Sequence, residues 1–514
     1  MSKTIIIIGA GLAGLSAALQ AAENGCNVKL VSSLPSERAQ SVMAEGGINA
    51  ALNTKDENDS PEEHFTDTIK AACGLADQNA VWGMTQAAPE LVHWLLKLGV
   101  KFNMSGYDDV DLRNFGGQKK KRTAFAQSDT GKQIMTAMID AVRRKEASGM
   151  VERFSHHSFL TLRLCGNICC GCVIRDEYSQ ETVELPGDAV IVATGGMHGL
   201  FGNTTGSLSN TGEVTAELFR LGVPLANGEM IQYHPTTVKC GGKRMLISEA
   251  ARGEGGRLFA MKDGKQWYFM EEKYPELGNL MPRDITAREI WNVSHESEVF
   301  LDMTEISEEI ISNKLSGLAD DCMTYLHKDI RKEPVSVLPG IHYFMGGILV
   351  DEQHRTPIQN LCAAGECCAQ YHGANRLGGN SLLGALYGGR VAAKSACEQA
   401  DVVDLSCATQ IDFPPASQIS EIKQLNKVMQ ETMGVVRNEN TLLNGIQTVQ
   451  ALTGNLPLLG MAVLKSALAR KESRGAHWRE DYPKSNDDDY LKTTVARFDG
   501  KQIQISFVPV PERR

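Results

Sequence analysis

The chain has 514 residues, of which 42% are hydrophobic and 22% charged, so it can bury a large core and should divide into two or three domains. Its formal net charge of -10 argues against nucleic acid as a main partner, because phosphate binding needs a concentrated positive surface. The basic run 119–122 is accordingly expected to be a solvated face. No apolar stretch approaches the roughly 20 residues of a membrane span, so no direct span is expected.

The thirteen cysteines form no regular disulfide framework, and no secretory hydrophobic region precedes the first strand. Reduced thiols in a cytoplasmic protein are therefore expected. Four of these cysteines cluster between positions 165 and 172, in an alternating segment typical of a strand, which places neighbours on opposite faces. No metal site is predicted there. The absence of a Cys-x-x-Cys-His sequence also argues against covalently attached haem.

The N-terminal segment has the pattern of a dinucleotide-binding unit. Thr4–Ile8 is predicted to be a buried parallel strand, and a Gly-x-Gly-x-x-Gly turn leads from it into a helix and then a second strand, Asn27–Val31. Glycines in this context allow a tight turn, and the helix N-terminus receives a pyrophosphate. The acid expected after the second strand is replaced by Ser32 and Ser33, so ribose recognition must differ.

Two later apolar strands end in glycine turns of the same kind. Ala189–Ala193 runs into Thr194 and Gly195, and Asn360–Gly365 is followed by the acid Glu366. Two late turns of this type around one early fingerprint favour FAD over NAD.

The predicted fold class is α/β. A Rossmann-like FAD-binding domain is interrupted by an α+β capping domain and followed by a helical C-terminal domain. Their predicted ranges are 1–230 with 340–403, then 231–339, and 404–514. Helical periodicity extends over Glu421–Leu452 and Met461–Lys471, and Asp487–Asp489 is expected to be a solvated loop.

Nearly the whole chain resembles the flavoprotein subunit of the succinate dehydrogenase / fumarate reductase family, of which L-aspartate oxidase is a relative. Six segments match in order and lead to the glycine-rich turn His372–Leu383. They are Ser41–Ile48, Arg113–Gly131, Gln232–Thr236, Ser248–Gly255, Pro282–Asp284 and His342–Gly347. The resemblance implies an FAD-dependent oxidoreductase that acts on a four-carbon dicarboxylate.

A dicarboxylate needs a cationic or hydrogen-bonding partner at each end, because two desolvated carboxylates cannot be left unpaired. His234, His342 and Arg376 are predicted to supply these partners. Taken singly, each histidine is more often a structural residue, and it is their joint occurrence between glycine turns that favours a binding role. The resemblance adds the hydroxyl groups of Thr236 and Ser248.

Reduction of an alkene requires hydride from flavin N5 at one carbon and a proton at the other. The family assigns the proton donor to the arginine that matches Arg283. Because an arginine has a pKa above about 12, its reprotonation needs a relay. Glu249 and Arg252 match the family's proton path and are expected three residues apart on a helical turn. An ordinary ion pair is the alternative for these two residues.

The fingerprint and the resemblance together predict the FAD contacts. They are Gly9, Gly11, Leu12, Ala13, Gly14, Ser32, Ser41, Gly46, Gly47, Ala193, Thr194, Gly195, Glu366, Asn380, Ser381 and Leu382. Glu213 is not included, since the family usually has an aspartate there. Gln40 stands where the membrane-complex members commonly carry a histidine bonded to FAD. Non-covalent FAD is therefore predicted, and the lower flavin potential that follows favours fumarate reduction.

Phe115 is predicted to contact the substrate. The resemblance implies that aspartate oxidases carry a glutamate at this position, where it binds the substrate amine. An apolar ring cannot pair with an ammonium group, so a fumarate reductase is the first hypothesis and L-aspartate oxidase the second. A reductase of another unsaturated acid and a non-catalytic flavoprotein are further alternatives. An iron-sulfur subunit or a soluble donor is implied as the electron source. Through such a partner the chain could sit at the inner face of a membrane.

Overall fold

The computed structural model describes residues 2–106, 109–399, 413 and 418–513. A five-stranded parallel sheet in the order β20-β10-β1-β2-β6 forms its centre. The strands are β1 (Thr4–Ile8), β2 (Asn27–Ser32), β6 (Val151–Ser155), β10 (Ala189–Val192) and β20 (Leu361–Ala363). The predicted parallel strands and the α/β class are confirmed.

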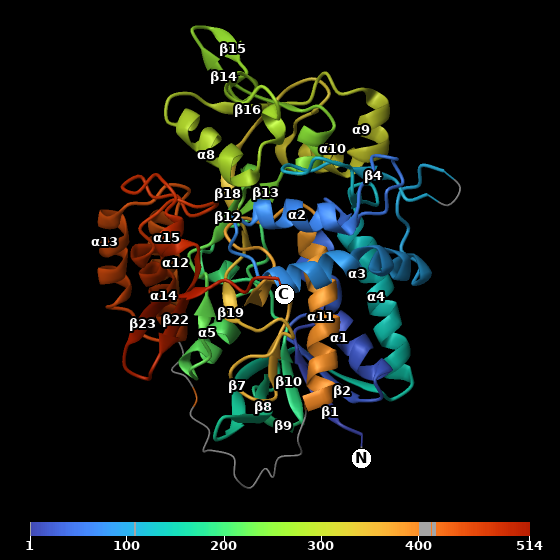
Figure 1. Ribbon diagram of the computed structural model, residues 1–514, viewed down its shortest axis with the longest axis vertical. Coiled ribbons are helices and arrows are strands. Elements are labelled where there is room, and N and C mark those ends of the chain that lie inside the picture. Colours follow the sequence, from blue (N-terminus) through green and yellow to red (C-terminus); the bar gives the residue numbers. More distant parts are fainter. Residues whose placement is uncertain (1, 107–108, 400–412, 414–417, 514) are drawn as a thin grey trace.

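After Thr4, strand β1 consists of four buried isoleucines, because both faces of this sheet are covered. Ile5 and Ile7 pack with helices, whereas Ile6 and Ile8 pack against a second sheet, as the two-residue period of a strand requires. The helices are α1 (Leu12–Glu23), α2 (Pro61–Ala71), α3 (Gln78–Lys97), α4 (Thr130–Ala147) and α11 (Asn380–Gln399), seen beside the sheet in Figure 1. The second sheet contains β7 (His157–Cys165), β8 (Ile168–Asp176) and β9 (Thr182–Pro186).

The cysteine cluster predicted to lie in one strand spans the hairpin of β7 and β8. Cys165 ends the first strand, and the other three cysteines lie in the second. Among the residues that the structure describes, no group of cysteine, histidine and acidic side chains is arranged to hold a metal ion. Eleven cysteines of the described ranges are free thiols, whereas Cys165 is disulfide-bonded, so the expectation of reduced thiols is wrong at that position.

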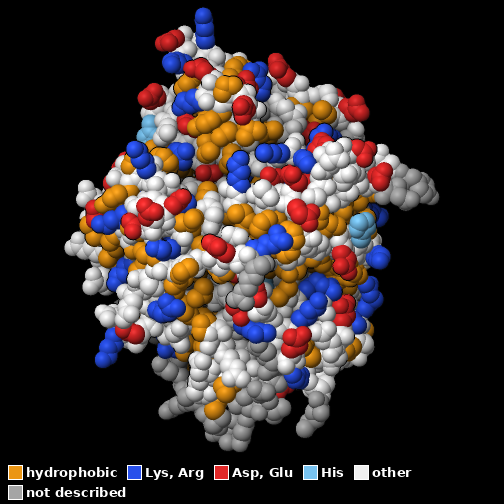
Figure 2. All heavy atoms as spheres, viewed as in Figure 1, with side chains coloured by type: hydrophobic (Ala, Val, Ile, Leu, Met, Phe, Trp, Pro, Cys, Tyr) orange, Lys and Arg blue, Asp and Glu red, His pale blue; other side chains and the backbone are white. Residues whose placement is uncertain are grey.

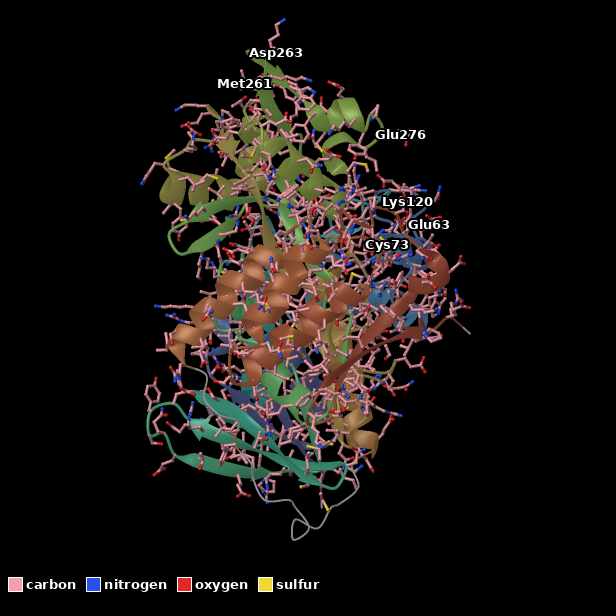
Figure 3. The ribbon with its side chains drawn as sticks, turned by 90° about the vertical axis from the view of Figure 1, so that its left-hand side faces the viewer. Glu63, Cys73, Lys120, Met261, Asp263 and Glu276 are labelled. Atoms are coloured by element: carbon pink, nitrogen blue, oxygen red, sulfur yellow. The ribbon has the colours of Figure 1, made fainter. Side chains whose placement is uncertain are left out.

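The unit at the top of Figure 1 has an apolar core of its own. In the sequence, this unit is inserted between the two segments that form the body with the central sheet. It contains the sheet β15-β14-β16-β17, and Figure 3 shows Met261 and Asp263 at the tip of its first hairpin, far from the central sheet. Its elements are β14 (Arg257–Lys262), β15 (Lys265–Trp267), β16 (Val299–Asp302), β17 (Val335–Ser336), α6 (Glu249–Gly253), α7 (Phe269–Lys273), α8 (Arg283–Ser294), α9 (Glu308–Lys314) and α10 (Ser316–Asp321). We call this unit the cap.

Two antiparallel strands connect the body to the cap. The chain enters along β12 (Ile231–Cys240) and returns along β18 (Leu338–Phe344), with β13 (Lys243–Leu246) on the outer side of β12. The register between β12 and β18 shifts near His234, at the proline of the Gln232–Thr236 segment. This irregular pairing brings the ring centroids of His234 and His342 to 5.1 Å from each other.

The C-terminal region is helical, as predicted, but its first helical segment is two helices. These are α12 (Ile419–Thr432) and α13 (Glu439–Val449), followed by α14 (Asn455–Ala469). The break follows from local chemistry, because Gly434 is a poor helix former and the Asn438 side chain caps α13 by accepting from Thr441 N–H. The predicted boundary at 403–404 lies outside the described residues.

A hairpin near the C-terminus was not foreseen from the sequence. Strands β22 (Lys492–Phe498) and β23 (Ile503–Pro509) extend a sheet with β21 (Cys368–Ala369), β19 (Gly347–Leu349) and β11 (Leu225–Ala226), and α5 (Glu213–Arg220) lies nearby. Asp487–Asp489 begins a short helix, α15 (Asp487–Tyr490), in place of the expected loop. The three aspartates are exposed, as expected, and Asp487 also pairs with Arg474.

The expectation for the basic run 119–122 is wrong at its last residue. Arg122 is fully buried and its Nη2 lies 2.9 Å from both Asp59 and Asp67. The three lysines before it remain at least partly exposed, and Lys120 lies beside Glu63 (Figure 3). Figure 2 shows basic and acidic side chains interspersed over this face of the molecule. Within the described ranges, no helix combines the length and the apolar character needed to cross a membrane.

Candidate active site

A cavity of about 1260 Å³ extends from the N-terminal glycine turn to the cap. Small-ligand pockets measure roughly 300–1,000 Å³, so this cavity has room for a dinucleotide together with a small substrate. One end is lined by the glycine turns of the body and the other by side chains of β12, β18 and the cap.

The glycine turn is packed so closely that its glycines could not carry side chains, as the turn of a dinucleotide-binding site requires. A Cβ on Gly9 would lie 2.2 Å from the Ala193 carbonyl oxygen, and one on Gly14 would lie 1.9 Å from the Gly9 oxygen. Helix α1 begins at the cavity, and its N-cap, Gly11, contributes no side chain to cap the first amides. The Leu12 N–H donates to the Ser41 hydroxyl at 3.3 Å, and the next amides of the first turn, those of Ala13 and Gly14, are placed to receive a pyrophosphate.

Most of the predicted FAD contacts line this cavity. They are Gly9, Gly11, Leu12, Ala13, Ser32, Ser41, Gly46, Gly47, Ala193, Thr194, Gly195, Glu366, Ser381 and Leu382. The Ser32 hydroxyl is buried without a hydrogen-bond partner in the described part of the chain, at the strand end where a ribose is expected. An unsatisfied buried hydroxyl of this kind fits a polar ligand group.

Two predicted FAD contacts do not line the cavity. Gly14 lies beneath the turn, against Gly9. The Asn380 side chain is buried and faces away, because its Oδ1 accepts from Asn49 Nδ2 at 2.7 Å and its Nδ2 donates to Thr68 at 3.0 Å. Asn380 thus anchors the start of α11, and a direct side-chain contact with FAD is not supported.

Two further residues that line the cavity bear on the predictions about FAD binding. Glu213, which was set aside, lines the cavity at the start of α5. Gln40 also lines it, and its Oε1 accepts a 2.6 Å hydrogen bond from Ser207 N–H. A glutamine amide there offers no imidazole nitrogen for a covalent bond to flavin.

At the cap end, three charged residues form a buried chain. Arg283, the first residue of α8, directs Nε and Nη2 at Glu249 Oε2, at 2.9 Å and 2.6 Å. Arg252 Nη2 lies 3.4 Å from the other oxygen of Glu249. Burial would raise the pKa of Glu249, but Arg283 and Arg252 together lower it, so the carboxylate is ionised. Arg283 and Glu249 line the cavity, whereas Arg252 lies behind them.

Gln232 links this chain to the glycine-rich turn of the body. Its Oε1 accepts from Arg283 Nη1 at 3.0 Å, and its Nε2 donates to the Arg376 carbonyl at 2.8 Å. The amide of Gln232 is fully buried, and both of its ends are satisfied. Gln232 lies within a segment that matches the family, but no role was predicted for it. Its position across the interface between cap and body was not readable from spacing.

The two histidines lie opposite each other and are neutral. Burial, followed by the charge of Arg283, lowers the pKa of both His234 and His342 well below the usual range. Thr236 N–H lies 3.2 Å from Nδ1 of His234, and the Thr205 hydroxyl lies 2.8 Å from Nδ1 of His342. In both rings Nδ1 is engaged by the protein, which leaves Nε2 for a ligand.

Arg376 is a buried cation on the body side of the cavity. Arg376 is only 3% exposed, and its Cζ lies 4.2 Å from the centroid of the Tyr343 ring. Its Nε has no hydrogen-bond partner, and no described carboxylate forms an ion pair with it. Burial and the neighbouring Arg283 lower its pKa to about 9. A buried cation in this state requires an anionic ligand.

Four charged groups at the cap end, of which Arg252 lies behind the cavity wall, together have a net positive charge. Three arginines, Arg252, Arg283 and Arg376, meet one ionised carboxylate, Glu249, and the two histidines are neutral. Two positive charges therefore remain among these groups. A dicarboxylate supplies two negative charges.

Of the other three residues predicted to contact the substrate, two line the cavity and one does not. Phe115 is 2% exposed and lines the cavity, with its ring beside Gly46. Ser248 also lines the cavity, where it caps α6. The Thr236 hydroxyl donates to the Ile247 carbonyl at 2.8 Å, and Thr236 does not line the cavity. Its predicted contact with substrate is not supported by this geometry.

Comparison with known proteins places the chain in a family. Residues 4–382 match the FAD binding domain model, and residues 452–513 match the model of the fumarate reductase flavoprotein C-terminal region. The chain is 38% identical to the succinate dehydrogenase flavoprotein subunit of Bacillus subtilis, with 100% of this chain and 98% of that relative covered. The chain belongs to the succinate dehydrogenase / fumarate reductase flavoprotein family.

Further relatives and solved structures agree with this assignment. The 8-methylmenaquinol:fumarate reductase flavoprotein subunit of Wolinella succinogenes is 32% identical over 100% of this chain and 92% of its own length. A mutant form of E. coli quinol fumarate reductase FrdA superposes with a TM-score of 0.91, at 27% identity, and covers 100% of this chain and 97% of that chain. The predicted family, fold class and FAD cofactor are confirmed, and this flavoprotein is an FAD-dependent oxidoreductase.

A carboxyl group that the sequence analysis did not single out lies in the flavoprotein's cavity. Glu45 lines it between Ser41 and Gly46, and one of its oxygens is buried without a hydrogen-bond partner in the described ranges. Burial raises its pKa to about 8, and Asp321 of the cap adds to the rise, whereas Arg113 opposes it. The acid was visible in the sequence, but its burial follows only from the fold.

Glu45 should make the stability of the flavoprotein depend on pH. The folded protein retains a proton that the unfolded chain releases, so unfolding becomes easier as pH rises between about 4.5 and 8. Relative to Glu45→Gln, the free energy of unfolding of the wild type should fall by up to about 1.4 kcal/mol per pH unit in that window. Denaturant unfolding of both FAD-loaded proteins at several pH values measures this. A difference that does not change with pH would contradict the prediction.

Proposed function

We propose that this flavoprotein binds fumarate and reduces it to succinate. The observation that carries the proposal is the buried Arg376, which has no ion pair among the described residues and lies near the further cation Arg283. Those charges suit the two carboxylates of a four-carbon acid, and the neutral His234 and His342 can bind them through Nε2.

The residues of the chain would act on the bound acid in three ways. Arg376 and the two histidines hold its carboxylates and withdraw charge from the alkene, which polarises it. FAD, when bound in the adjoining part of the cavity, supplies a hydride. Arg283 donates the proton at the other alkene carbon and recovers it through Glu249 and Arg252, whose contacts of 2.6 Å and 3.4 Å form a continuous path.

The cap supports this chemistry by its placement. Arg283 and Glu249 belong to the cap, whereas Arg376 belongs to the body, and Gln232 connects the two through Arg283 and the Arg376 carbonyl. We therefore propose that the cap, predicted as 231–339, closes over the substrate. Closure excludes water and brings the proton donor to the alkene.

The direction of the reaction is proposed from Gln40. A covalent link to flavin generally raises its potential, and Gln40 has no imidazole with which to form one. A lower potential favours reduction of fumarate. Denaturation of the purified protein with acid should release FAD into the supernatant, and flavin that stays with the polypeptide would refute non-covalent attachment.

Two other reactions remain as alternatives. Succinate oxidation is favoured by the relative from Bacillus subtilis, whose name is succinate dehydrogenase flavoprotein subunit. Oxidation of L-aspartate is disfavoured because Phe115, an apolar ring in the cavity, cannot pair with an ammonium group.

The test is anaerobic reoxidation of the reduced flavin. The FAD-loaded protein is reduced, and fumarate is added while the oxidised flavin absorbance is followed. Rapid reoxidation, with slower reduction of the flavin by succinate in the reverse assay, supports fumarate reduction. If succinate reduces the flavin faster than fumarate reoxidises it, succinate oxidation is the favoured direction. Peroxide formed from L-aspartate in air identifies L-aspartate oxidation.

The flavoprotein also needs an electron source, which we propose to be an iron-sulfur subunit or a soluble donor. The names of the relatives from Bacillus subtilis and Wolinella succinogenes describe each as a flavoprotein subunit. Through such an assembly the chain would work at the cytoplasmic face of a membrane. Co-purification should recover an iron-sulfur protein, whereas full activity of the isolated chain with a soluble reductant would argue for the soluble donor.

A further inference from the structure

Two cysteines far apart in sequence meet at the end of the FAD-binding body opposite the cavity. The Sγ atoms of Cys26 and Cys397 lie 3.1 Å apart, although 371 positions separate them. Among the eleven free cysteines of the described ranges, no other pair has its sulfur atoms in such contact. Neither cysteine takes part in the proposed chemistry.

The pair joins the far ends of two helices that begin at the cavity. Helix α1 starts with Leu12 and α11 starts just before Ser381, and both of these residues line the cavity. The two helices lie side by side in Figure 1 and pack closely, since a Cβ on Gly389 would lie 2.3 Å from the Ala13 oxygen. Cys26 follows α1, and Cys397 is in the last turn of α11.

We propose that Cys26 and Cys397 are a site of reversible oxidation, at which a low-molecular-weight disulfide converts the two thiols into an intramolecular disulfide. The sulfur atoms need to approach by only about 1 Å to reach the 2.03–2.05 Å of a disulfide bond. The bond would clamp α1 and α11 together at the end opposite the cofactor.

The chemical steps follow from the exposure of each sulfur. Cys397 is partly exposed and Cys26 is only 5% exposed, so Cys397 reacts first. Its thiolate attacks one sulfur of the small disulfide and releases one small thiol. Cys26 then attacks Sγ of Cys397 in the mixed disulfide and releases the second small thiol. The protein loses two electrons and two protons, and the small disulfide takes up both.

The surroundings of Cys397 make this oxidation slow at neutral pH. Burial, together with the contact from Cys26, raises the pKa of Cys397 to about 12, which the Asn24 side chain and the Lys3 ammonium only partly oppose. The thiolate fraction is therefore small at pH 7 and increases about tenfold per pH unit. The pair should respond to sustained oxidising conditions and not to brief ones.

The bond should stabilise the folded protein because it restricts the unfolded chain over a long loop. The experiment uses the full-length, FAD-loaded protein treated with oxidised glutathione, followed by peptide mapping under non-reducing conditions. A Cys26–Cys397 linked peptide and a rise in Tm of about 5 °C are expected, both reversed by dithiothreitol. The rate of linkage should increase about tenfold from pH 7 to pH 8.

Three variants make the test specific. Cys397→Ser and Cys26→Ser should each lose the linked peptide and the rise in Tm. Cys73→Ser is the matched control, because Cys73 is also partly exposed but its sulfur donates to the Ala71 carbonyl and not to another cysteine, and it should behave as the wild type. If a variant fails to fold, peptide mapping of the oxidised wild type still shows whether the Cys26–Cys397 disulfide forms. Absence of the linked peptide, or a rise in Tm that persists in Cys397→Ser, would overturn the proposal.

Discussion

Replacing Arg283 with alanine is expected to lower fumarate turnover by about 10²–10⁴-fold while the protein keeps its FAD. The guanidinium is the cavity-lining end of the Arg252–Glu249–Arg283 chain, and the substitution removes both the proton donor and its 2.6 Å contact with Glu249. Turnover with a reduced dye as electron donor, together with flavin absorbance of the purified protein, measures both quantities.

Arg288→Ala is the matched control for this experiment. Arg288 lies on the same helix, α8, but its guanidinium is 3.9 Å above the Trp478 ring and it does not line the cavity. Its removal should leave turnover nearly unchanged. Near-wild-type turnover by a flavin-loaded Arg283→Ala protein would exclude Arg283 as the proton donor. If both variants lose their flavin, the substitutions act on folding and not on catalysis.

Substitution of Gly14 by alanine is expected to prevent the protein from holding FAD. The added Cβ would lie 1.9 Å from the Gly9 oxygen and 2.9 Å from the Gly9 carbonyl carbon. These are backbone atoms that cannot rotate away, so α1 must move from the turn that forms the start of the cavity. Overpacking of a tight core costs about 1–3 kcal/mol or more, and here the strain falls on the cofactor turn itself.

The measurement is the ratio of bound flavin to protein, with Tm as the readout of folding. We expect Gly14→Ala to retain less than about a tenth of the wild-type flavin, because each 1.4 kcal/mol lost lowers affinity tenfold. Gly242→Ala is the control, since a Cβ there meets no atom within 4 Å and its backbone does not require glycine. Full flavin occupancy in Gly14→Ala would show that the turn tolerates a side chain.

The parts of this flavoprotein that were predictable from sequence have local or strongly patterned causes. Residues 5–8 are continuously apolar because both faces of the strand are covered, and the glycine turn after them has few backbone alternatives. The pairing of Glu249 with Arg252 was predictable because residues three apart meet on one helical turn.

Other features depended on contacts between distant segments. The basic run did not reveal that Arg122 is buried, because Asp59 and Asp67, which pair with it, are more than fifty residues away in the chain. Asn380 has the sequence position of a flavin contact, but Asn49 and Thr68 draw its side chain to the opposite side.

The sequence by itself determined the family and the FAD-binding fold, and it predicted polar groups for a dicarboxylate, most of which line the cavity. Helical and strand periods, glycine turns and motif order are properties of neighbouring residues, so they remain visible without a structure. Only the tertiary structure decided that Gln232 joins Arg283 to the Arg376 turn, that Glu45 is a buried carboxyl and that Cys26 meets Cys397. Each of these depends on which distant segments pack together and exclude water, and no local pattern records that packing.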